Sequence, residues 1–368
     1  MNKNIPDNSR RKFIHDLGLA GLGIPFLSSC SFLDNKQNTK KLGIALVGLG
    51  NYATGQLAPA LQRSQYCYLA GIVTGSPAKA ENWKSRYNIP EKNIYNYENF
   101  DSIKDNPAID IVYVVLPNFL HAAYSIRAAK AGKHVICEKP MAMNAAECDQ
   151  MMAACKEAGK MLSIGYRLHF EPYNLEMARL GQQKIYGTIK KMSAGFGFSA
   201  GDPTQWRLKK DLSGGGPMVD VGIYCMQGFC YTTGMLPIAV TAQEGKKMDK
   251  EKFKEVEASL SFQFEMPNGL ICEGKASYEE GMNYLKAEAD KGIFELTSAF
   301  IYSGQAGYTP NGPMNFPKVN QQANQIDAFA LSIKNNTASI VPGEMGKRDV
   351  QYIHAVYEAM RTGKRIEI

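Results

Sequence analysis

Between residues 42 and 166, short apolar runs alternate with segments in which apolar residues recur every three or four positions. The runs 42–47, 68–73 and 109–116 are almost continuously apolar, which is typical of parallel strands covered on both faces. The segments between them have the period of amphipathic helices. This alternation predicts a doubly wound parallel sheet for this part of the chain.

After about residue 167 the pattern changes to an alternation of apolar and polar positions, which is typical of strands with one buried face. Turn sequences such as Pro267-Asn268-Gly269 join these segments. We expect a second domain built on an open, largely antiparallel sheet and closed by helices at 320–334 and 346–361. The expected strands are 189–198, 257–265, 269–278, 285–289 and 292–296.

A glycine turn links the first apolar run to the first helical segment, with the sequence Gly48-Leu49-Gly50-Asn51-Tyr52-Ala53. The first glycine permits a tight turn, and the second lets the backbone approach a pyrophosphate at the helix N-terminus. In its strand–turn–helix context this predicts an α/β Rossmann dinucleotide-binding domain over 42–166. Residues 167–368 then form an α+β domain with an open, mostly antiparallel sheet, whose C-terminal helices can pack back on the first domain. The alternative is a tight glycine turn without a ligand.

The second apolar run ends at Thr74-Gly75-Ser76-Pro77-Ala78-Lys79. NAD-binding proteins carry a carboxylate near this point, where it bonds the ribose 2′-hydroxyl. Here hydroxyls and Lys79 stand in its place, and such groups suit a 2′-phosphate. The segment therefore favours NADP over NAD, and the alternative is a helix lysine that faces solvent.

Polar residues follow two further apolar runs. Glu138-Lys139-Pro140 comes after the run 134–136, and Asn118 comes shortly after the run 109–116 and begins a helix that contains His121. Open α/β sheets bind their ligands at the carboxyl ends of the strands, so these residues are candidate site residues. The alternatives are a salt bridge at the strand end and a histidine of the core or of a helix cap.

A triple glycine, 214–216, indicates a loop that opens a helix containing Asp220 and Tyr224. These two residues are four positions apart, so we expect them on one helical face. A carboxylate and a phenol presented together to a cofactor domain are a plausible acid/base pair. The alternative is an aspartate of the first helical turn and a tyrosine of the core.

Composition narrows the class of protein further. The chain has 368 residues, 45% hydrophobic and 21% charged, with a net charge of +7, which is typical of a globular protein of about two domains. No run of Lys and Arg interleaved with aromatic residues is present, which excludes a typical single-strand nucleic-acid binder. The eight cysteines have neither a Cys-x-x-Cys spacing nor a zinc-ligand spacing, so we expect no metal site.

The first thirty residues have the pattern of an export signal. Ser9-Arg10-Arg11-Lys12-Phe13-Ile14 is a twin-arginine sequence, and an apolar segment at 17–27 follows it. Leu27-Ser28-Ser29-Cys30 resembles the lipobox of bacterial lipoproteins, in which Cys30 would carry the lipid. We expect a signal at 1–30 and a tether at 31–41, and therefore a periplasmic protein that is exported already folded. The alternative is a poorly structured tail.

Three motifs together resemble one family. Gly48-Leu49-Gly50, Glu138-Lys139-Pro140 and Gly214-Gly215-Gly216 with Asp220 and Tyr224, in this order and spacing, are similar to the glucose-fructose oxidoreductase / inositol dehydrogenase (Gfo/Idh/MocA) family of NAD(P)-dependent sugar enzymes. The likeness covers essentially all of 42–368. Many relatives carry His at the position of Tyr224, and the periplasmic glucose-fructose oxidoreductase branch resembles this chain in carrying Tyr.

The resemblance implies a site for the cofactor and a catalytic group. Along the cofactor it places Gly48, Gly50, Asn51 and Tyr52 at the pyrophosphate, Thr74, Lys79 and Tyr97 at the adenosine phosphate end, Leu116, Asn118 and His121 in the middle, and Glu138 and Lys139 by the nicotinamide. Arg167, Trp206 and Arg207 would position cofactor or substrate, and Lys139, Asp220 and Tyr224 would form the catalytic group.

The implied chemistry suits these residue types. Oxidising a sugar hydroxyl needs a hydride acceptor and a base for the proton, and a phenol, with a pKa near 10, is a poor base at neutral pH. A nearby ammonium such as Lys139 favours the phenolate form. Because an exported enzyme meets no pool of free NADP(H), we expect a tightly held cofactor that passes a hydride between two sugars in ping-pong fashion.

The same observations leave two alternative functions open, and they also predict an oligomer. One alternative is an NAD-dependent glycosidase that acts by transient oxidation. The other is a non-catalytic, cofactor-loaded, sugar-binding lipoprotein. An open sheet also predicts a homo-oligomer formed through the second domain.

Overall fold

The computed structural model describes residues 40–368. The expected export signal and Cys30 lie outside the described residues. In the part that is described, no helix has the length and apolar character needed to span a bilayer.

The first sheet has six strands in the order β3-β2-β1-β4-β5-β6, and all neighbouring pairs are parallel. Its central strands are buried except at Leu42, the first residue of β1, because helices cover both faces. This confirms the parallel sheet that the continuous apolar runs predicted. The strands are β1 (Leu42–Val47), β2 (Cys67–Val73), β3 (Ile94–Tyr95), β4 (Ile111–Val114), β5 (His134–Cys137) and β6 (Leu162–Ile164). The α-helices among them are α2 (Ala58–Arg63), α3 (Pro77–Tyr87), α4 (His121–Lys130) and α5 (Ala145–Glu157).

The second sheet has nine strands in the order β14-β13-β12-β11-β7-β10-β9-β8-β15. Every neighbouring pair is antiparallel except β7 and β10, so the prediction of a mostly antiparallel sheet is confirmed. The strands are β7 (Ile189–Gly197), β8 (Ala239–Glu244), β9 (Ser259–Glu265), β10 (Ile271–Ser277), β11 (Met282–Ala289), β12 (Gly292–Leu296), β13 (Gly307–Thr309), β14 (Gly312–Pro313) and β15 (Ile366–Glu367).

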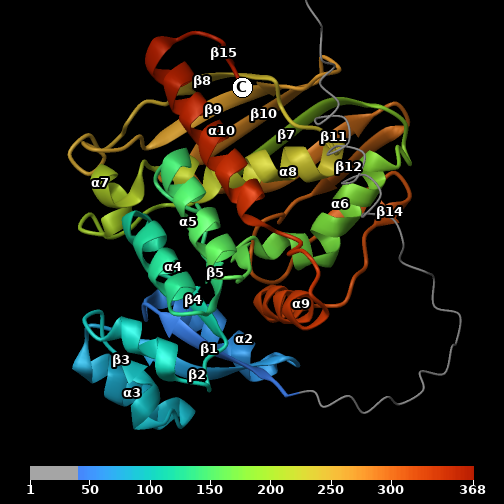
Figure 1. The fold of residues 1–368 in the computed structure, drawn as a ribbon. Helices are drawn as coiled ribbons and strands as arrows, with labels where there is room; N and C mark the ends of the chain where they lie inside the picture. Colours follow the sequence, from blue (N-terminus) through green and yellow to red (C-terminus); the bar gives the residue numbers. More distant parts are fainter. Residues whose placement is uncertain (1–39) are drawn as a thin grey trace, which may run out of the picture. The chain divides into compact units, whose positions relative to one another are not determined.

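The two faces of the second sheet differ. Phe262 and Phe264 of β9 point to the covered face, where α8 (Ile223–Thr233) and α10 (Gly343–Thr362) pack (Figure 1). Ser261 and Gln263, between and beside them, are exposed. The alternation along this strand is therefore the direct cause of one buried and one open face.

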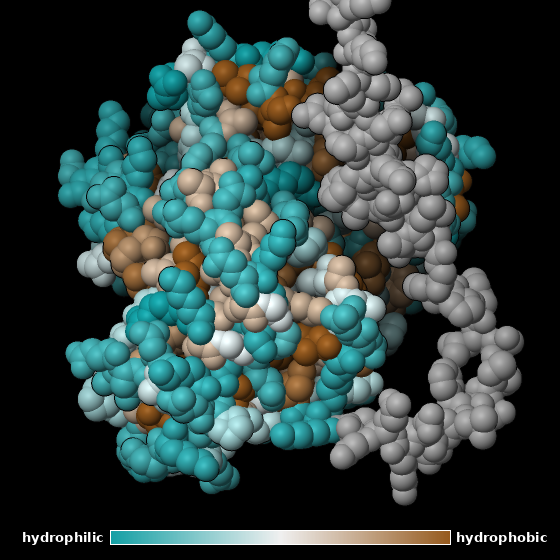
Figure 2. Space-filling view, viewed as in Figure 1, coloured by the Kyte–Doolittle hydropathy of each residue, from teal (hydrophilic) through white to brown (hydrophobic). Residues whose placement is uncertain are grey.

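The helix α9 (Gln321–Asn335) belongs to the second domain by sequence but packs against the first sheet. Its Ile326 and Phe329 lie in the same apolar cluster as Ile44 and Leu46 of β1. The second domain also contains the α-helix α6 (Pro172–Gln182) and the short α-helix α7 (Lys210–Ser213). On the face drawn in Figure 2, apolar residues form separate patches among polar ones.

Candidate active site

A cleft of about 970 Å³ lies between the carboxyl ends of the first sheet's strands and the second domain. Both domains supply its walls, which places it where open α/β sheets bind ligands. Every site residue expected from the sequence lines it: Gly48, Gly50, Asn51, Tyr52, Thr74, Lys79, Tyr97, Leu116, Asn118, His121, Glu138, Lys139, Arg167, Trp206, Arg207, Asp220 and Tyr224.

The glycine turn forms one end of the cleft. Gly48 has φ +95°, and a Cβ there would lie 2.6 Å from the carbonyl oxygen of Val115, so a side chain is excluded. At Gly50 a Cβ would meet nothing within 4 Å, which means that this stretch of backbone faces open space. Gly50 and Asn51 are exposed at the start of the following helix. This bare helix start is a cradle that fits the pyrophosphate of a dinucleotide.

A cation stands beside the glycine turn. The Lys79 ammonium donates to the carbonyl oxygen of Leu49 at 3.1 Å, so it reaches back from α3 to the turn. Ser76 caps α3 by accepting from the Lys79 backbone N–H at 3.4 Å, and Thr74 Oγ1 accepts from the Ser76 N–H at 3.2 Å. These residues fit a phosphorylated ribose, since the segment offers hydroxyls and an ammonium and no carboxylate.

Lys139 joins the two other expected catalytic residues at the opposite end. Its Nζ donates to Asp220 Oδ1 at 3.0 Å and to the Asp220 carbonyl oxygen at 2.6 Å. The same ammonium lies 5.0 Å from the centre of the Tyr224 ring. Residues 218–222 form a π-helical turn before α8 begins at Ile223, so Asp220 and Tyr224 do not share one regular α-helix. Both still line the cleft. The Lys139 ammonium contacts both residues.

Charges fix the protonation of Lys139 and Asp220. Burial alone would raise the pKa of Asp220, but Lys139 and Arg207 lower it to about 2. Burial alone would lower the pKa of Lys139, but the charges of Tyr224 and Asp220 raise it above its usual value. At neutral pH the site therefore holds an ammonium and a carboxylate in direct contact, with the ammonium beside the ring of Tyr224.

Two further contacts hold Asp220. Arg207 Nε lies 3.3 Å from Asp220 Oδ2, and the Tyr278 hydroxyl donates to the same oxygen at 3.1 Å. Arg207 also packs over the Trp206 ring at 4.6 Å. Sequence reasoning missed Tyr278, which directly follows β10 and reaches the site only because β10 lies beside the π-helical turn. No local signal in the sequence marks it.

Glu138 faces the interior of the first domain. Its Oε1 accepts from the Tyr113 hydroxyl at 2.7 Å, and Gln325 of α9 donates to that hydroxyl at 2.9 Å. Burial raises the pKa of Glu138. This chain of hydrogen bonds ties the end of β5 to a helix near the end of the protein, so Glu138 supports the backbone from which Lys139 projects.

His121 and Asn118 fasten the loops around the cleft. His121 Nδ1 lies 2.8 Å from the Pro140 carbonyl oxygen, and its Nε2 lies 2.8 Å from the Leu116 carbonyl oxygen. The ring thus joins the segments that follow β4 and β5. Asn118 donates to the Ser213 carbonyl oxygen at 2.7 Å, which links the first domain to the loop before the triple glycine.

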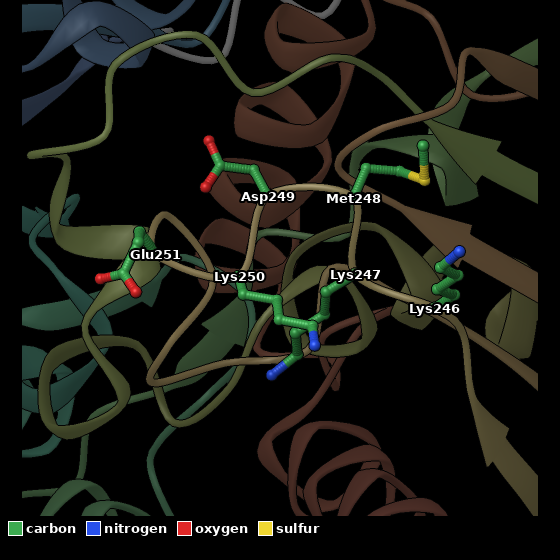
Figure 3. A pocket seen from close by; sticks show the side chains of 6 residues that line it. All are labelled: Lys246, Lys247, Met248, Asp249, Lys250 and Glu251. Carbon is green, nitrogen blue, oxygen red and sulfur yellow. The ribbon is translucent and has the colours of Figure 1, made fainter.

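A second surface depression, of about 590 Å³, lies in the loop 246–251. Its lysine, methionine and acidic side chains point in different directions (Figure 3), so they do not converge on a ligand. Among residues 40–368, no group of three or more His, Cys, Asp and Glu side chains is placed to hold a metal ion.

Three features lie along one cleft: a glycine turn, a cation for the ribose phosphate, and a group of an ammonium, a carboxylate and a phenol. Together they define the class of nicotinamide-dinucleotide-dependent oxidoreductases. Comparison with known families agrees with this class. Residues 42–166 match the family model described as an oxidoreductase family with an NAD-binding Rossmann fold, and residues 174–295 match the GFO/IDH/MocA C-terminal domain. The chain belongs to the Gfo/Idh/MocA oxidoreductase family, as its motifs predicted.

Three relatives place the chain within the family. The solved structure of aldose-aldose oxidoreductase from Caulobacter crescentus, complexed with glycerol, is 40% identical with a TM-score of 0.86, over 89% of this chain and 100% of that one. D-xylose 1-dehydrogenase [NADP(+)] of Haloarcula marismortui is 27% identical over 88% of this chain and 92% of its own. D-glucoside 3-dehydrogenase of Escherichia coli is 24% identical over 91% and 100%.

Proposed function

We propose that the protein moves a hydride between a sugar hydroxyl or carbonyl and a tightly held NADP. The observation that carries this function is the placement of Lys139, Asp220 and Tyr224 along the same cleft as the glycine turn. Lys79 beside that turn favours NADP over NAD. The relatives add support, since one of them is an aldose-aldose oxidoreductase and another an NADP-dependent xylose dehydrogenase.

Bound NADP would supply the hydride acceptor. In sugar oxidation, the Tyr224 phenolate would take the proton of the sugar hydroxyl and become a phenol, while the carbon that bears the hydroxyl gives up a hydride to the acceptor. In the reverse direction the phenol would return the proton to the carbonyl oxygen and become the phenolate again. Lys139, 5.0 Å from the ring centre, stabilises the phenolate form of Tyr224, which acts as the base in oxidation and is regenerated in reduction. Asp220 holds Lys139 in place and charged.

The expected export of the protein favours permanent retention of the cofactor. The twin-arginine sequence around Arg10 and Arg11 predicts transport of a folded protein to the periplasm, where free NADP(H) is absent. One sugar would then reduce the cofactor and a second would reoxidise it. Anchoring through Cys30 belongs to the same proposal, and the mass of the mature N-terminus tests it.

The open face of the second sheet favours a homo-oligomer. Tyr284 is 36%, Ile293 44% and Tyr308 50% exposed. Their pairing partners in the ladders put all three on this face. Light scattering of the purified protein gives the mass that tests this association.

The retained cofactor has a direct experiment. Purified protein is dialysed, part of it is denatured, and the released nicotinamide is identified by absorbance and mass. The rest receives two aldoses with no added cofactor. We expect many turnovers with the pair, and with one sugar alone no more than one equivalent of reduced nicotinamide.

A requirement for added NADP(H) in stoichiometric amounts contradicts retention. A protein that leaves nicotinamide absorbance unchanged with any sugar contradicts the oxidoreductase itself. Cleavage of a chromogenic glycoside without net redox change would instead favour the glycosidase alternative.

A further inference from the structure

Tyr302 belongs to the second domain but reaches the first. Its ring lies 5.9 Å from the ring of Tyr52, the residue two positions after Gly50. Tyr302 is 45% exposed, and both rings line the cleft. This aromatic pair, an exposed Tyr302 and a half-buried Tyr52, joins the two domains beside the glycine turn.

The backbone that carries Tyr302 is held by buried polar side chains. Arg167, 2% exposed, donates to the carbonyl oxygens of Phe300 at 2.5 Å and Ile301 at 3.2 Å. Gln321, 1% exposed, donates to those of Ile301 and Tyr302, both at 3.0 Å. Arg167 also donates to the side-chain oxygen of Gln321. Carbonyls of three consecutive residues are thus fixed from one side, which leaves the loop little freedom.

The buried guanidinium of Arg167 lies beside two aromatic rings. Within residues 40–368 it forms no ion pair with a carboxylate, and its buried Nε has no hydrogen-bond partner. Its guanidinium lies 4.5 Å from the centre of the Tyr302 ring and 5.0 Å from that of Tyr224. Burying a cation in this way is costly, so the arrangement indicates a need to fix this loop and these rings.

The Tyr302 hydroxyl lies among the groups at the reactive end. Desolvation of the hydroxyl on the side of Tyr302 that faces the protein, together with the nearby Tyr224, raises the pKa of Tyr302 to about 12 against the opposing charges of Arg167 and Lys139. Tyr302 is therefore a neutral phenol at neutral pH, and a ring of this kind stacks on or covers a flat ligand group without adding charge.

We propose that residues 300–302 form a clasp in which the rings of Tyr302 and Tyr52 close over the bound dinucleotide and slow its release. This inference rests on the proposed function and names the residues that would retain the cofactor. Tyr302 and Tyr52 are binding residues in it. Arg167 and Gln321 are positioning residues, since they act through the loop.

Release of NADPH from the loaded protein tests the clasp. Wild type, Tyr302→Ala and Tyr302→Phe are loaded with NADPH, and the loss of bound NADPH fluorescence is followed after an excess of NADP is added. We expect Tyr302→Ala to release NADPH about tenfold faster, the size of effect that one lost aromatic contact gives. Tyr302→Phe keeps the ring and should stay within about twofold of wild type.

Tyr308→Ala is the matched control, because Tyr308 is an exposed tyrosine of β13 that does not line the cleft. Gln321→Leu tests the positioning role from outside the cleft. We expect it to speed release while thermal melting shows that the protein still folds. If Gln321→Leu fails to fold, the comparison of Tyr302→Ala with Tyr302→Phe decides alone.

Equal release rates for wild type and Tyr302→Ala overturn the clasp, and so does a Tyr302→Phe variant as fast as Tyr302→Ala. The clasp and the retained cofactor can fail separately. Equal rates together with sugar-pair turnover leave the proposed function standing. If wild type loses NADPH within one turnover but still tenfold more slowly than Tyr302→Ala, the retained cofactor is contradicted and the clasp is supported.

Discussion

At the scale of single residues, Lys139 organises the reactive end. It bonds Asp220 twice and faces the ring of Tyr224, and Glu138 beneath it is tied to Tyr113. The sequence predicted Lys139, Asp220 and Tyr224 through the resemblance of their motifs to one family; spacing alone left a structural role open for Asp220 and Tyr224. It did not predict Tyr278, which lies 58 residues from Asp220 and is brought to it by strand pairing.

Substitution of Tyr224 and Lys139 tests their roles. We expect Tyr224→Phe to lower turnover by about 100-fold or more, because the hydroxyl proton loses its acceptor. Lys139→Ala should lower turnover in the same direction, since the phenolate loses its stabilising charge. Both variants should keep bound nicotinamide, which the absorbance of denatured protein measures.

Lys286→Ala is the control for the loss of a lysine, because Lys286 pairs with Glu288 on β11, away from the cleft. Hydride transfer near the wild-type rate in both site variants would remove these residues from the catalytic group.

At the scale of elements, the segment 246–256 supports the substrate side of the cleft. Phe253 is buried in a small cluster with Ala200, Leu208 and Tyr278, and its ring stacks on that of Tyr278 at 6.4 Å. Lys252 donates to the Ala200 carbonyl oxygen. Lys209 pairs with Glu255 at 3.0 Å. The loop that carries Trp206 and Arg207 is therefore fixed from behind by this segment, whose outer part Figure 3 shows.

Phe253→Ala should loosen this support. We expect the KM for sugar to rise on the order of tenfold, because a small displacement of positioning groups weakens catalysis strongly. The rate of NADPH release should stay unchanged, since the segment does not touch the glycine turn. Steady-state kinetics with the loaded enzyme measure the first quantity, and fluorescence the second.

Met248→Ala, at a position 79% exposed in the same segment, is the control. An unchanged KM in a folded Phe253→Ala variant would show that the segment has no part in holding the sugar.

Elements with a strong period were predictable from sequence, and short or irregular ones were not. The helix predicted at 320–334 is found at Gln321–Asn335, and the strand predicted at 189–198 is found at Ile189–Gly197. The two-residue strands β3, β14 and β15 carry too few positions to show a period. The π-helical turn 218–222 depends on tertiary contacts, which no local pattern records.

At the scale of the whole molecule, residues far apart in the chain build each wall of the cleft. Two residues of α9 support the cleft. Gln325 supports Glu138 through the Tyr113 hydroxyl, and Gln321 holds the loop that carries Tyr302. The sequence predicted the helix from its apolar face. It could not predict which polar residues of that helix would point inward, because a partner can lie far away in the chain. Tyr113, the partner of Gln325, lies 212 residues before it.

Removal of the cofactor should therefore lower the stability of the folded protein. Restoring NADPH at about 100 times its Kd should return about 2.7 kcal/mol of unfolding free energy, since the ligand binds the folded state. Thermal melting of stripped protein with and without NADPH measures this gain. NADH at the same concentration should stabilise less, because Lys79 stands where a carboxylate would bind its ribose. Greater stabilisation by NADH would contradict the preference for NADP.

The anchoring of residues 300–302 by Arg167 and Gln321 has a consequence for biogenesis. In the proposed clasp these bonds hold the loop over the ligand, so a ligand would enter the folded protein more slowly than the folding chain. Cofactor loading would then be a step of folding, completed inside the cell. If the protein is exported as proposed, a molecule that leaves the cell empty would stay inactive, because it meets no free NADP(H) there.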